Sequence, residues 1–354
     1  MKPLYIASTA EYSGKTLVGL GLAFRLKADG LRVGYLKPLG KRPTLVEGKV
    51  TDQDASFFKE TFGLAEPLET ICPVVLTHDL TVQALKGEKK ELKKDIARAY
   101  EMIKKDKDVV LIGGAGNLYD GAFLGIPGIM LAQAFNWPVL IIDRYFHEIG
   151  IDSILAASHG LKDRLIGAVL NRVIEGSDEY VREMVAPFLE TTKVPVLGII
   201  SQDSILESVS VRQLLEDLSG TLLYGQEHLE GLVARFAIGA MDAEHALRHF
   251  AKIENKAVIT GGDRPDIQSA ALETSTRCLI LTGGFAPNEM VMAKARAGGV
   301  PVMSVKYDTL TAVERIEGLL GAVSIREERK VARMKEIMEA HFDFRRLYAL
   351  MGLS

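Results

Sequence analysis

A loop that combines glycine, lysine and threonine follows the first apolar stretch of this 354-residue sequence. Residues 8–16 read STAEYSGKT, between the apolar run PLYIAS and the helix-like segment LVGLGLAFRL. Backbone N–H groups at such a helix start point toward anionic oxygens, the lysine adds a positive charge, and the threonine hydroxyl can hold Mg²⁺. The pattern predicts a loop that binds nucleotide phosphates, although Thr9 stands where GxxxxGK[ST] has its first glycine. An ordinary strand-to-helix turn is the alternative.

Short β-branched runs alternate with helical segments over residues 1–201, which is typical of a parallel sheet with helices on both faces. We therefore expect an α/β fold that places the loop at the end of a strand. The charged segment 83–107 is predicted to be a solvated crossover helix rather than a basic binding face. The predicted strands are residues 3–8, 33–40, 109–116, 138–145, 165–173 and 194–201.

The regular alternation weakens over residues 202–230, and we place a domain boundary near Ser208. Three further strand and helix pairs, which start near Lys256, Arg277 and Val300, predict a smaller α/β domain. Thr311 and Glu314 fit a capping box at the last of these helices. The predicted division is 1–207, 208–322 and a helical tail over 323–354, which would serve in packing or as a dimer contact.

Glycine-containing turns follow the first two strands of the second domain. If these strands are parallel neighbours, both turns meet at the sheet edge where open α/β sheets bind ligands. Arg264 can then clamp a phosphate or a carboxylate. The alternative is that the glycines only make tight turns and that Arg264 pairs with Asp266 or Asp308. The candidate ligand-binding residues are Gly261, Gly262, Asp263, Arg264, Thr282, Gly283 and Gly284.

Composition excludes several classes of protein. A net charge of −3 and a pI near 6.2 argue against nucleic-acid binding through a basic face. The apolar runs are shorter than the roughly 20 residues that a membrane-spanning helix needs. The N-terminus lacks the features of a signal peptide, so we expect a cytoplasmic protein. Cys72 and Cys278, without CxxC spacing, predict neither a disulfide framework nor a thiolate metal site.

Residues 8–16 resemble the phosphate-binding loop of dethiobiotin synthetase, whose family also carries threonine at the first position. Lys37-Pro38 resembles the Lys-Pro pair of that family, whose lysine lies near the transferred phosphate. The segment 52–55 resembles the one that supplies a carboxylate to Mg²⁺, and Asn171 resembles an asparagine near the nucleotide base. The resemblance implies catalytic roles for Lys15 and Lys37, and Mg²⁺ at Thr16 and Asp54. It implies ATP contacts from Thr9, Glu11, Ser13, Gly14, Lys15, Thr16 and Asn171.

Two positions depart from this family. Gly113 stands where the family has a metal-binding glutamate, and Lys41 stands where it has a small hydroxyl residue. Mg²⁺ loses a hard oxygen ligand at position 113. Asp143 is either a substitute acidic partner or, as we favour, a cap of the next turn. Nucleotide binding survives such changes more easily than phosphoryl transfer, which needs the metal to neutralise developing charge.

Residues 211–320 resemble the DRTGG domain, on the turns that contain Gly261 and Gly283. The order of the two domains is similar to that in the N-terminal portion of long bacterial phosphotransacetylases, whose acyltransferase domain lies beyond these 354 residues. In such relatives the DRTGG domain is associated with dimerisation and ligand sensing. The resemblance therefore implies a homo-oligomer, expected to be a dimer, and a small-molecule ligand.

Three hypotheses of function follow. The first is a regulatory protein that binds ATP and Mg²⁺ and senses a ligand through the DRTGG domain. The second is an ATP-dependent carboxylate-activating ligase similar to dethiobiotin synthetase or cobyrinic acid diamide synthase. The third is an interaction subunit for a separately encoded acyltransferase, with a vestigial nucleotide site.

Overall fold

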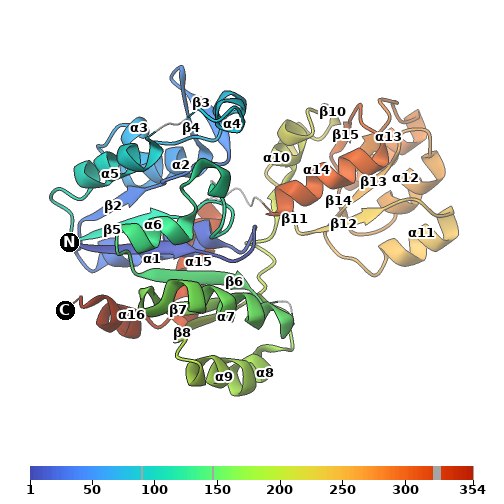
Figure 1. Ribbon diagram of the computed structural model, residues 1–354. Coiled ribbons are helices and arrows are strands. Elements are labelled where there is room, and N and C mark those ends of the chain that lie inside the picture. Colours follow the sequence, from blue (N-terminus) through green and yellow to red (C-terminus); the bar gives the residue numbers. More distant parts are fainter. Residues whose placement is uncertain (89–90, 146, 322–327, 354) are drawn as a thin grey trace. The chain divides into compact units, whose positions relative to one another are not determined.

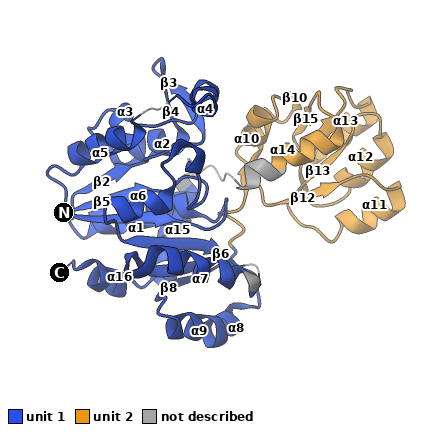
Figure 2. Ribbon diagram, in the orientation of Figure 1, with its two compact units in different colours: residues 1–202, 325–354 blue, residues 203–324 orange. Residues whose placement is uncertain are grey.

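The computed structural model describes residues 1–88, 91–145, 147–321 and 328–353. The backbone divides into two compact units (Figure 2). Unit 1 comprises Met1–Gln202 and the C-terminal segment Ile325–Ser354, and unit 2 comprises Asp203–Ser324. Unit 2 is therefore an insertion in the sequence of unit 1.

Within the described residues, the main sheet of unit 1 has six parallel strands in the order β2-β5-β1-β6-β7-β8 (Figure 1). Every strand predicted for the first domain lies in this sheet, which confirms the α/β fold class. Strand β1 has β5 on one side and β6 on the other, so the strand order reverses at β1. In open α/β sheets, ligands bind at the carboxyl ends of the strands beside such a reversal. The bounds are β1 Lys2–Ala7, β2 Val33–Leu36, β5 Val109–Gly113, β6 Val139–Arg144, β7 Leu165–Val173 and β8 Val196–Ser201; a separate hairpin pairs β3 Pro43–Val46 with β4 Lys49–Asp52.

Helices cover both faces of this sheet because successive strand side chains point to opposite sides. Tyr5 of β1 packs near Trp137 at 5.9 Å between ring centroids, whereas Ile6 lies beside Gly19 of helix α1. The segment predicted to be a crossover helix forms α5, with apolar residues buried and lysines facing solvent. The helices are α1 Lys15–Ala28, α2 Gln53–Phe62, α3 Leu68–Ile71, α4 His78–Leu85, α5 Leu92–Ile103, α6 Gly128–Ala134, α7 Ile149–Leu161, α8 Asp178–Tyr180 and α9 Ala186–Thr191, with shorter turns η1 Ala122–Leu124, η2 Lys162–Arg164 and η3 Val181–Val185.

The C-terminal tail forms α15 (Glu328–His341) and α16 (Phe344–Met351) within unit 1 (Figure 1). Helix α15 packs on α1, and both helices contact β8. Gly21 of α1 permits this close approach, since a Cβ there would lie 2.5 Å from Cγ of Met338. Arg25 forms an ion pair of 2.8 Å with Glu339, and the Tyr348 hydroxyl donates to Asp29 at 2.6 Å. The tail is thus part of the fold of unit 1.

In the described part of unit 2, a five-stranded sheet has the order β10-β15-β14-β13-β12, with β10 antiparallel and the others parallel. The three predicted strand and helix pairs are present, but the sequence analysis missed β10 and β12. Both are short, partly exposed edge strands, so their apolar pattern is weak. The bounds are β10 Thr221–Tyr224, β12 Arg235–Ile238, β13 Lys256–Gly261, β14 Thr276–Thr282 and β15 Val302–Ser304; β9 Val209–Ser210 pairs with β11 Leu232–Val233; the helices are α10 Val211–Asp217, η4 Gln226–His228, α11 Ala243–Phe250, α12 Pro265–Leu272, α13 Glu289–Gly298 and α14 Thr309–Gly321.

The predicted capping box of α14 is wrong. The carboxylate of Asp308 accepts hydrogen bonds from the backbone N–H and the hydroxyl of Thr311, both at 2.9 Å. Asp308 therefore caps the first turn, and Thr311 is its donor. The sequence offers two overlapping cap patterns here, and the ionised carboxylate accepts more strongly than a hydroxyl.

The two cysteines are buried, free thiols, and burial raises the pKa of both. The described residues contain no group of three or more His, Cys, Asp or Glu side chains placed to hold a metal ion. Over the same residues, no helix has the length and apolar character needed to cross a bilayer.

Candidate functional site

The loop between β1 and α1 is shaped by a glycine and an asparagine. Gly14, directly before α1, has φ 89°, which is left-handed. A Cβ at Gly14 would lie 2.2 Å from Nδ2 of Asn171, and this amide donates to the Ser13 carbonyl at 2.8 Å. Asn171 at the end of β7 thus supports the loop backbone, and the buried Ser13 hydroxyl closes the loop on the Ala10 carbonyl at 3.0 Å.

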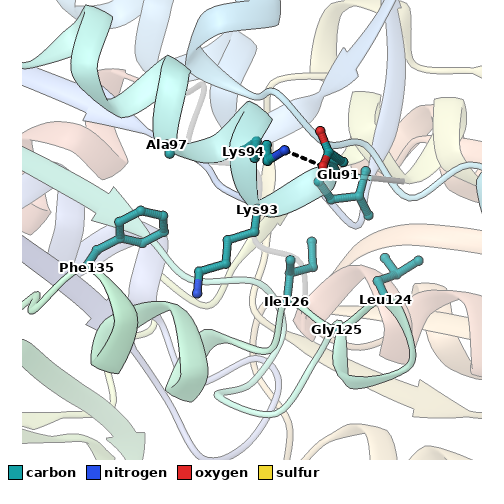
Figure 3. Close-up of a pocket in the computed structure, with 9 residues that line it drawn as sticks. Glu91, Lys93, Lys94, Ala97, Leu124, Gly125, Ile126 and Phe135 are labelled. Carbon is teal, nitrogen blue, oxygen red and sulfur yellow. Dashed lines mark hydrogen bonds and ion pairs between the residues drawn. The ribbon is translucent and has the colours of Figure 1, made fainter. Parts of the chain in front are cut away.

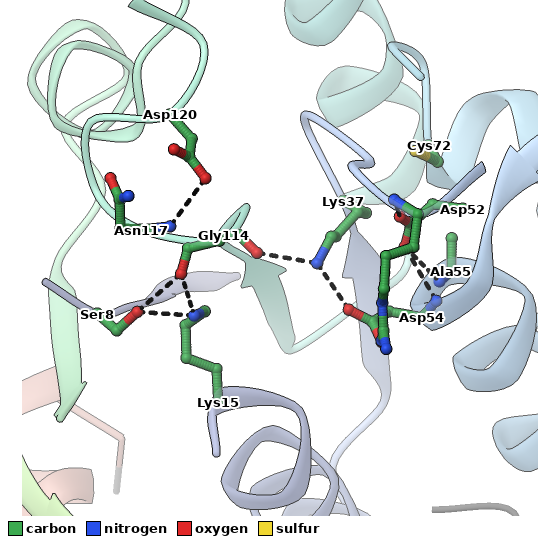
Figure 4. Close-up of polar contacts among 12 residues, drawn as sticks. Ser8, Lys15, Lys37, Asp52, Asp54, Ala55, Cys72, Gly114, Asn117 and Asp120 are labelled. Carbon is green, nitrogen blue, oxygen red and sulfur yellow. Dashed lines mark hydrogen bonds and ion pairs between the residues drawn. The ribbon is translucent and has the colours of Figure 1, made fainter. Parts of the chain in front are cut away.

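Lys15 places its ammonium group against neutral oxygens. Its Nζ donates to the Ser8 hydroxyl at 2.7 Å and to the Gly116 carbonyl at 2.6 Å (Figure 4). Burial and the positive charge of Lys37 lower the pKa of Lys15 to about 8. Its hydrogen-bond acceptors carry no charge, so an anion that reached this position would stabilise the protonated amine.

Thr9 and Asp143 fix the start of the loop. The Thr9 backbone N–H donates to Oδ1 of Asp143 at 2.8 Å, and its hydroxyl donates to Oδ2 at 2.5 Å. Asp143 stands near the end of β6, which is next to β1 in the sheet. Burial raises the pKa of this carboxyl, against the effect of its bonds to Thr9. Threonine at this position thus supplies a second anchor that glycine lacks.

The predicted magnesium ligand Asp54 lies in an ion-pair network. Its Oδ2 accepts from Lys37 Nζ at 2.9 Å, and its Oδ1 pairs with Arg42. Lys37 also donates to the Gly114 carbonyl at 2.9 Å (Figure 4). Although burial works in the opposite direction, Asp54 holds the pKa of Lys37 above its usual range, and the two cations hold that of Asp54 below. Asp52 accepts from the Asp54 N–H at 2.9 Å and caps α2.

A second network surrounds Gly116. Lys41 Nζ donates to Asp120 at 2.7 Å and pairs with Glu11 of the phosphate-binding loop. A Cβ at Gly116 would lie 2.5 Å from the nearest Asp120 oxygen and 2.6 Å from a Glu11 oxygen, so any side chain there would have to displace these carboxylates. Lys41 therefore joins the loops that follow β1, β2 and β5.

Position 113 has no room for a side chain. A Cβ there would meet the hydroxyl of Tyr35, whose ring stacks on Phe58 at 3.8 Å between centroids. The aromatic side chain of Tyr35 thus occupies the space that a carboxylate side chain at position 113 would need.

The phosphate-binding groups fit a nucleotide, but the acidic groups do not fit Mg²⁺. The carboxylates of Glu11 and Asp120 pair with Lys41, Asp54 pairs with two cations, and Asp143 bonds Thr9. Thr16, next to Lys15 in the first turn of α1, is the remaining predicted ligand. Mg²⁺ is usually held by one or two carboxylates together with phosphate oxygens and waters. Because the carboxylates of Glu11, Asp54 and Asp120 are already paired with cations, no magnesium chemistry follows from these contacts.

The structure brings the two glycine turns of unit 2 together, since Gly261 pairs with Thr282 across β13 and β14. Their backbone donors are already used: Gly262 donates to Thr282 at 3.0 Å, and Gly283 and Gly284 donate to the 305–307 segment. Arg264 pairs with Asp266 at 3.2 Å and donates to the Met241 carbonyl. The side chains of Asp263 and Phe285 are among the exposed groups at this edge, the latter 56% exposed.

A cavity of about 440 Å³ lies elsewhere in unit 1, between α5 and the loop at Leu124 (Figure 3). Lys93 extends into it above an apolar floor that includes Ile126 and Phe135. None of the predicted site residues lines it.

The sequence analysis missed several residues of the phosphate-binding region. Tyr35, Arg42 and Asp120 were not predicted to belong to it. What they share is position, because each lies in or after β2 or β5, the two strands on the same side of β1 in the sheet. Charged residues that follow adjacent parallel strands are expected to converge.

Comparison with known proteins gives two domain matches. The AAA domain family matches residues 2–210, and the DRTGG domain matches residues 213–319. The phosphate acetyltransferase of Synechocystis sp. is 25% identical over 362 residues, which cover 97% of this chain and 51% of that protein. That of Nitratidesulfovibrio vulgaris is 26% identical, over 96% of this chain and 50% of its own length. These matches cover nearly all of this chain, but the chain spans only about half the length of these curated relatives.

A shorter match and two solved structures complete the comparison. The ATP-dependent dethiobiotin synthetase of Methanocaldococcus jannaschii is 30% identical over 32% of this chain and 53% of its own length. The CBS and DRTGG domains of Clostridium perfringens pyrophosphatase, complexed with diadenosine tetraphosphate, match at 23% identity and TM-score 0.30, over 46% of this chain and 78% of that chain. The septum site-determining protein MinD of Pyrococcus horikoshii, complexed with Mg-ADP, matches at 16% identity and TM-score 0.39, over 58% and 83%.

These matches agree with the domain order that the sequence resemblance implied. Since the first family covers more than half of the chain, the chain belongs to the AAA domain family, with a dethiobiotin-synthetase-like phosphate-binding domain followed by a DRTGG domain.

Proposed function

We propose that unit 1 binds ATP through residues 8–16 and that the chain is regulatory. The observation that carries the proposal is the position of Lys15, whose ammonium bonds only the neutral oxygens of Ser8 and Gly116 among the described residues. It lies in the first turn of α1, where backbone N–H groups also face an incoming anion. Phosphate oxygens supply the negative charge that this arrangement lacks.

The contacts favour binding over turnover. Phosphoryl transfer requires groups that neutralise developing charge. The carboxylate of Asp54 is not free to bind a metal ion while it pairs with Lys37 and Arg42. Gly113 supplies no carboxylate where the resembling family has a metal-binding glutamate. We therefore propose a site that holds ATP with little hydrolysis.

Unit 2 is proposed to sense a small ligand or to join two copies of the chain. The convergence of its two glycine turns and the exposed Phe285 support this role. Light scattering of the purified chain, with and without ATP, tests for a dimer. A monomer at every concentration would leave ligand sensing as the role of unit 2.

One observation favours a carboxylate-activating enzyme as the second candidate. Lys15 and Lys37 donate to the carbonyls of Gly116 and Gly114, two residues apart on one loop. Two ammonium groups near each other are suited to a phosphate in transfer. A substrate acid that stimulates ADP release would favour this candidate.

Calorimetric titration with ATP tests the proposal, with ADP formation followed in the same samples. Wild type and Lys15→Ala are compared, each with and without Mg²⁺. We expect binding by wild type, weak or no binding by the variant, and little ADP. Rapid ATP hydrolysis by wild type that is abolished in Lys15→Ala would favour the second candidate, a carboxylate-activating enzyme. If wild type does not bind ATP, the remaining hypothesis is an interaction subunit with a vestigial nucleotide site.

A further inference from the structure

The cavity between α5 and the loop at Leu124 has an apolar floor. Ile126 is buried, and Leu124 and Phe135 are partly buried and pack against the core of unit 1. The backbone N–H groups of Leu124, Gly125 and Ile126 are used, because each donates to a carbonyl of residues 121–122 at 3.0 Å. A Cβ at Gly125 would meet no atom within 4 Å, so the space beside it is open. A molecule on this floor therefore meets carbon surface rather than free backbone donors.

The opposite wall comes from the start of α5 and carries the charges. Lys94 pairs with Glu91, so its ammonium group already has an anionic partner. Lys93 has no ion-pair or hydrogen-bond partner among the residues that the structure describes. Its side chain extends over Ile126 and Phe135, with the ammonium group above the apolar floor (Figure 3). The cavity thus combines carbon surface with one unpaired positive charge.

These features select for an anion with an apolar body. An ammonium group forms charge-assisted hydrogen bonds with a carboxylate, and each methylene group that leaves water for carbon surface improves affinity by about fourfold. Because one cation is unpaired and Glu91 adds a carboxylate to the rim, a single negative charge fits better than two. The volume of about 440 Å³ lies within the range of small-molecule sites, roughly 300–1,000 Å³.

We propose that this cavity binds a small monocarboxylate with an apolar chain, such as a medium-chain fatty acid anion, and that Lys93 is the partner of its carboxylate. The chain lies against Ile126 and Phe135, and the carboxylate stays in contact with water beside the exposed Lys93. None of residues 8–16 lines the cavity, so the site is separate from the phosphate-binding loop. Binding at this site does not depend on ATP.

Isothermal titration calorimetry of the full chain with sodium octanoate tests the proposal. Wild type is expected to bind octanoate saturably, with one molecule per chain. Shorter carboxylates are expected to bind up to about fourfold more weakly for each methylene group removed, because less apolar surface is buried. Octylammonium has the same chain and the opposite charge, and it is expected not to bind.

Three variants locate the ligand. Lys93→Met keeps most of the apolar stem without the charge and is expected to weaken octanoate binding by about tenfold, the usual effect of one charge-assisted contact. Lys105→Met is the matched control, because Lys105 is an exposed lysine that does not line the cavity, and it is expected to bind as wild type does. Ala97 lines the cavity, so Ala97→Phe fills part of it and is expected to abolish binding. Circular dichroism spectra verify that each variant has folded.

The outcomes separate a built site from non-specific association. Absence of saturable octanoate binding by wild type would overturn the proposal. Binding that Lys93→Met and Ala97→Phe both leave unchanged would place the ligand elsewhere and would also overturn it. An equal loss in Lys93→Met and Lys105→Met would show that only the net charge matters, which contradicts a specific role for Lys93.

Discussion

The hydroxyl oxygen of Tyr35 lies 2.3 Å from the point that a Cβ of residue 113 would occupy. Tyr35 belongs to β2 and Gly113 ends the neighbouring β5, so their contact follows from the order of the sheet. Stacking on Phe58 holds the tyrosine ring in place, with planes 6° apart. Any side chain at position 113 must displace this ring.

Gly113→Ala is therefore expected to destabilise the protein by about 1–3 kcal/mol, the usual range for overpacking a buried site. Urea denaturation measures the change. Gly150→Ala is the matched control, because a Cβ there has an ordinary contact distance of 3.8 Å to its nearest atom. Alanine is a better helix former than glycine, so the control should be neutral or stabilising. Equal destabilisation by both variants would contradict the steric argument.

The pKa of Lys15 sets a pH dependence for nucleotide binding. With a pKa of about 8, the free protein carries an ammonium group below pH 8 and a neutral amine above it. Bound phosphate stabilises the ammonium, so binding above pH 8 includes the uptake of a proton. The affinity for ATP is expected to fall by up to about tenfold per pH unit above that point.

Calorimetry between pH 7 and 9.5 measures this fall, and two buffers of different ionisation enthalpy report the proton uptake. The nucleotide does not titrate in that range, since phosphate has its second pKa near 6. A constant affinity over the whole interval would contradict the assignment to Lys15.

Asp54→Asn is expected to cost about 3–5 kcal/mol, because it leaves Lys37 and Arg42 without their anion. The folded-state pKa of Asp54 is depressed, so its contribution to stability is present above the unfolded value of about 4 and is lost as pH falls below it. Wild type should therefore lose stability on acidification more steeply than the variant. Urea denaturation from pH 7 down to pH 3 measures both slopes. Parallel curves would contradict the pairing.

Thr9→Val removes one of the two hydrogen bonds that fix the phosphate-binding loop to Asp143, with little change in volume. The affinity for ATP should fall by about tenfold as the loop loses its fixed conformation. The loss should be equal in EDTA and in Mg²⁺. A loss confined to Mg²⁺ would instead indicate that Asp143 acts on a metal ion.

Periodicity located the main sheet because parallel strands buried on both faces leave long β-branched runs, such as that of β6. The same reasoning could not find β10 or β12, which have four residues each, most of them partly or fully exposed. The cap at Asp308 was missed because two patterns overlap within a few residues. Local sequence shows such alternatives but does not rank them.

The position of the loop over residues 8–16 could be predicted because its motif is contiguous in the sequence. In the structure Gly14 of this loop is left-handed, with φ 89°. The pairing of Asp54 could not, since Lys37 and Arg42 reach it only after β2 and α2 have packed. Opposite charges near the ends of adjacent strands predict proximity, but they do not predict which cation each carboxylate receives. Contacts between distant segments decide that.

Because the C-terminal tail belongs to unit 1, unit 2 is covalently linked to unit 1 at both of its ends. If unit 2 unfolds while unit 1 stays folded, residues 203–324 become a long closed loop within unit 1. Closing a loop of that length costs about 5 kcal/mol of chain entropy. A ligand that stabilises unit 2 thus also protects unit 1 from this entropic penalty, a thermodynamic link that requires no contact between the two units.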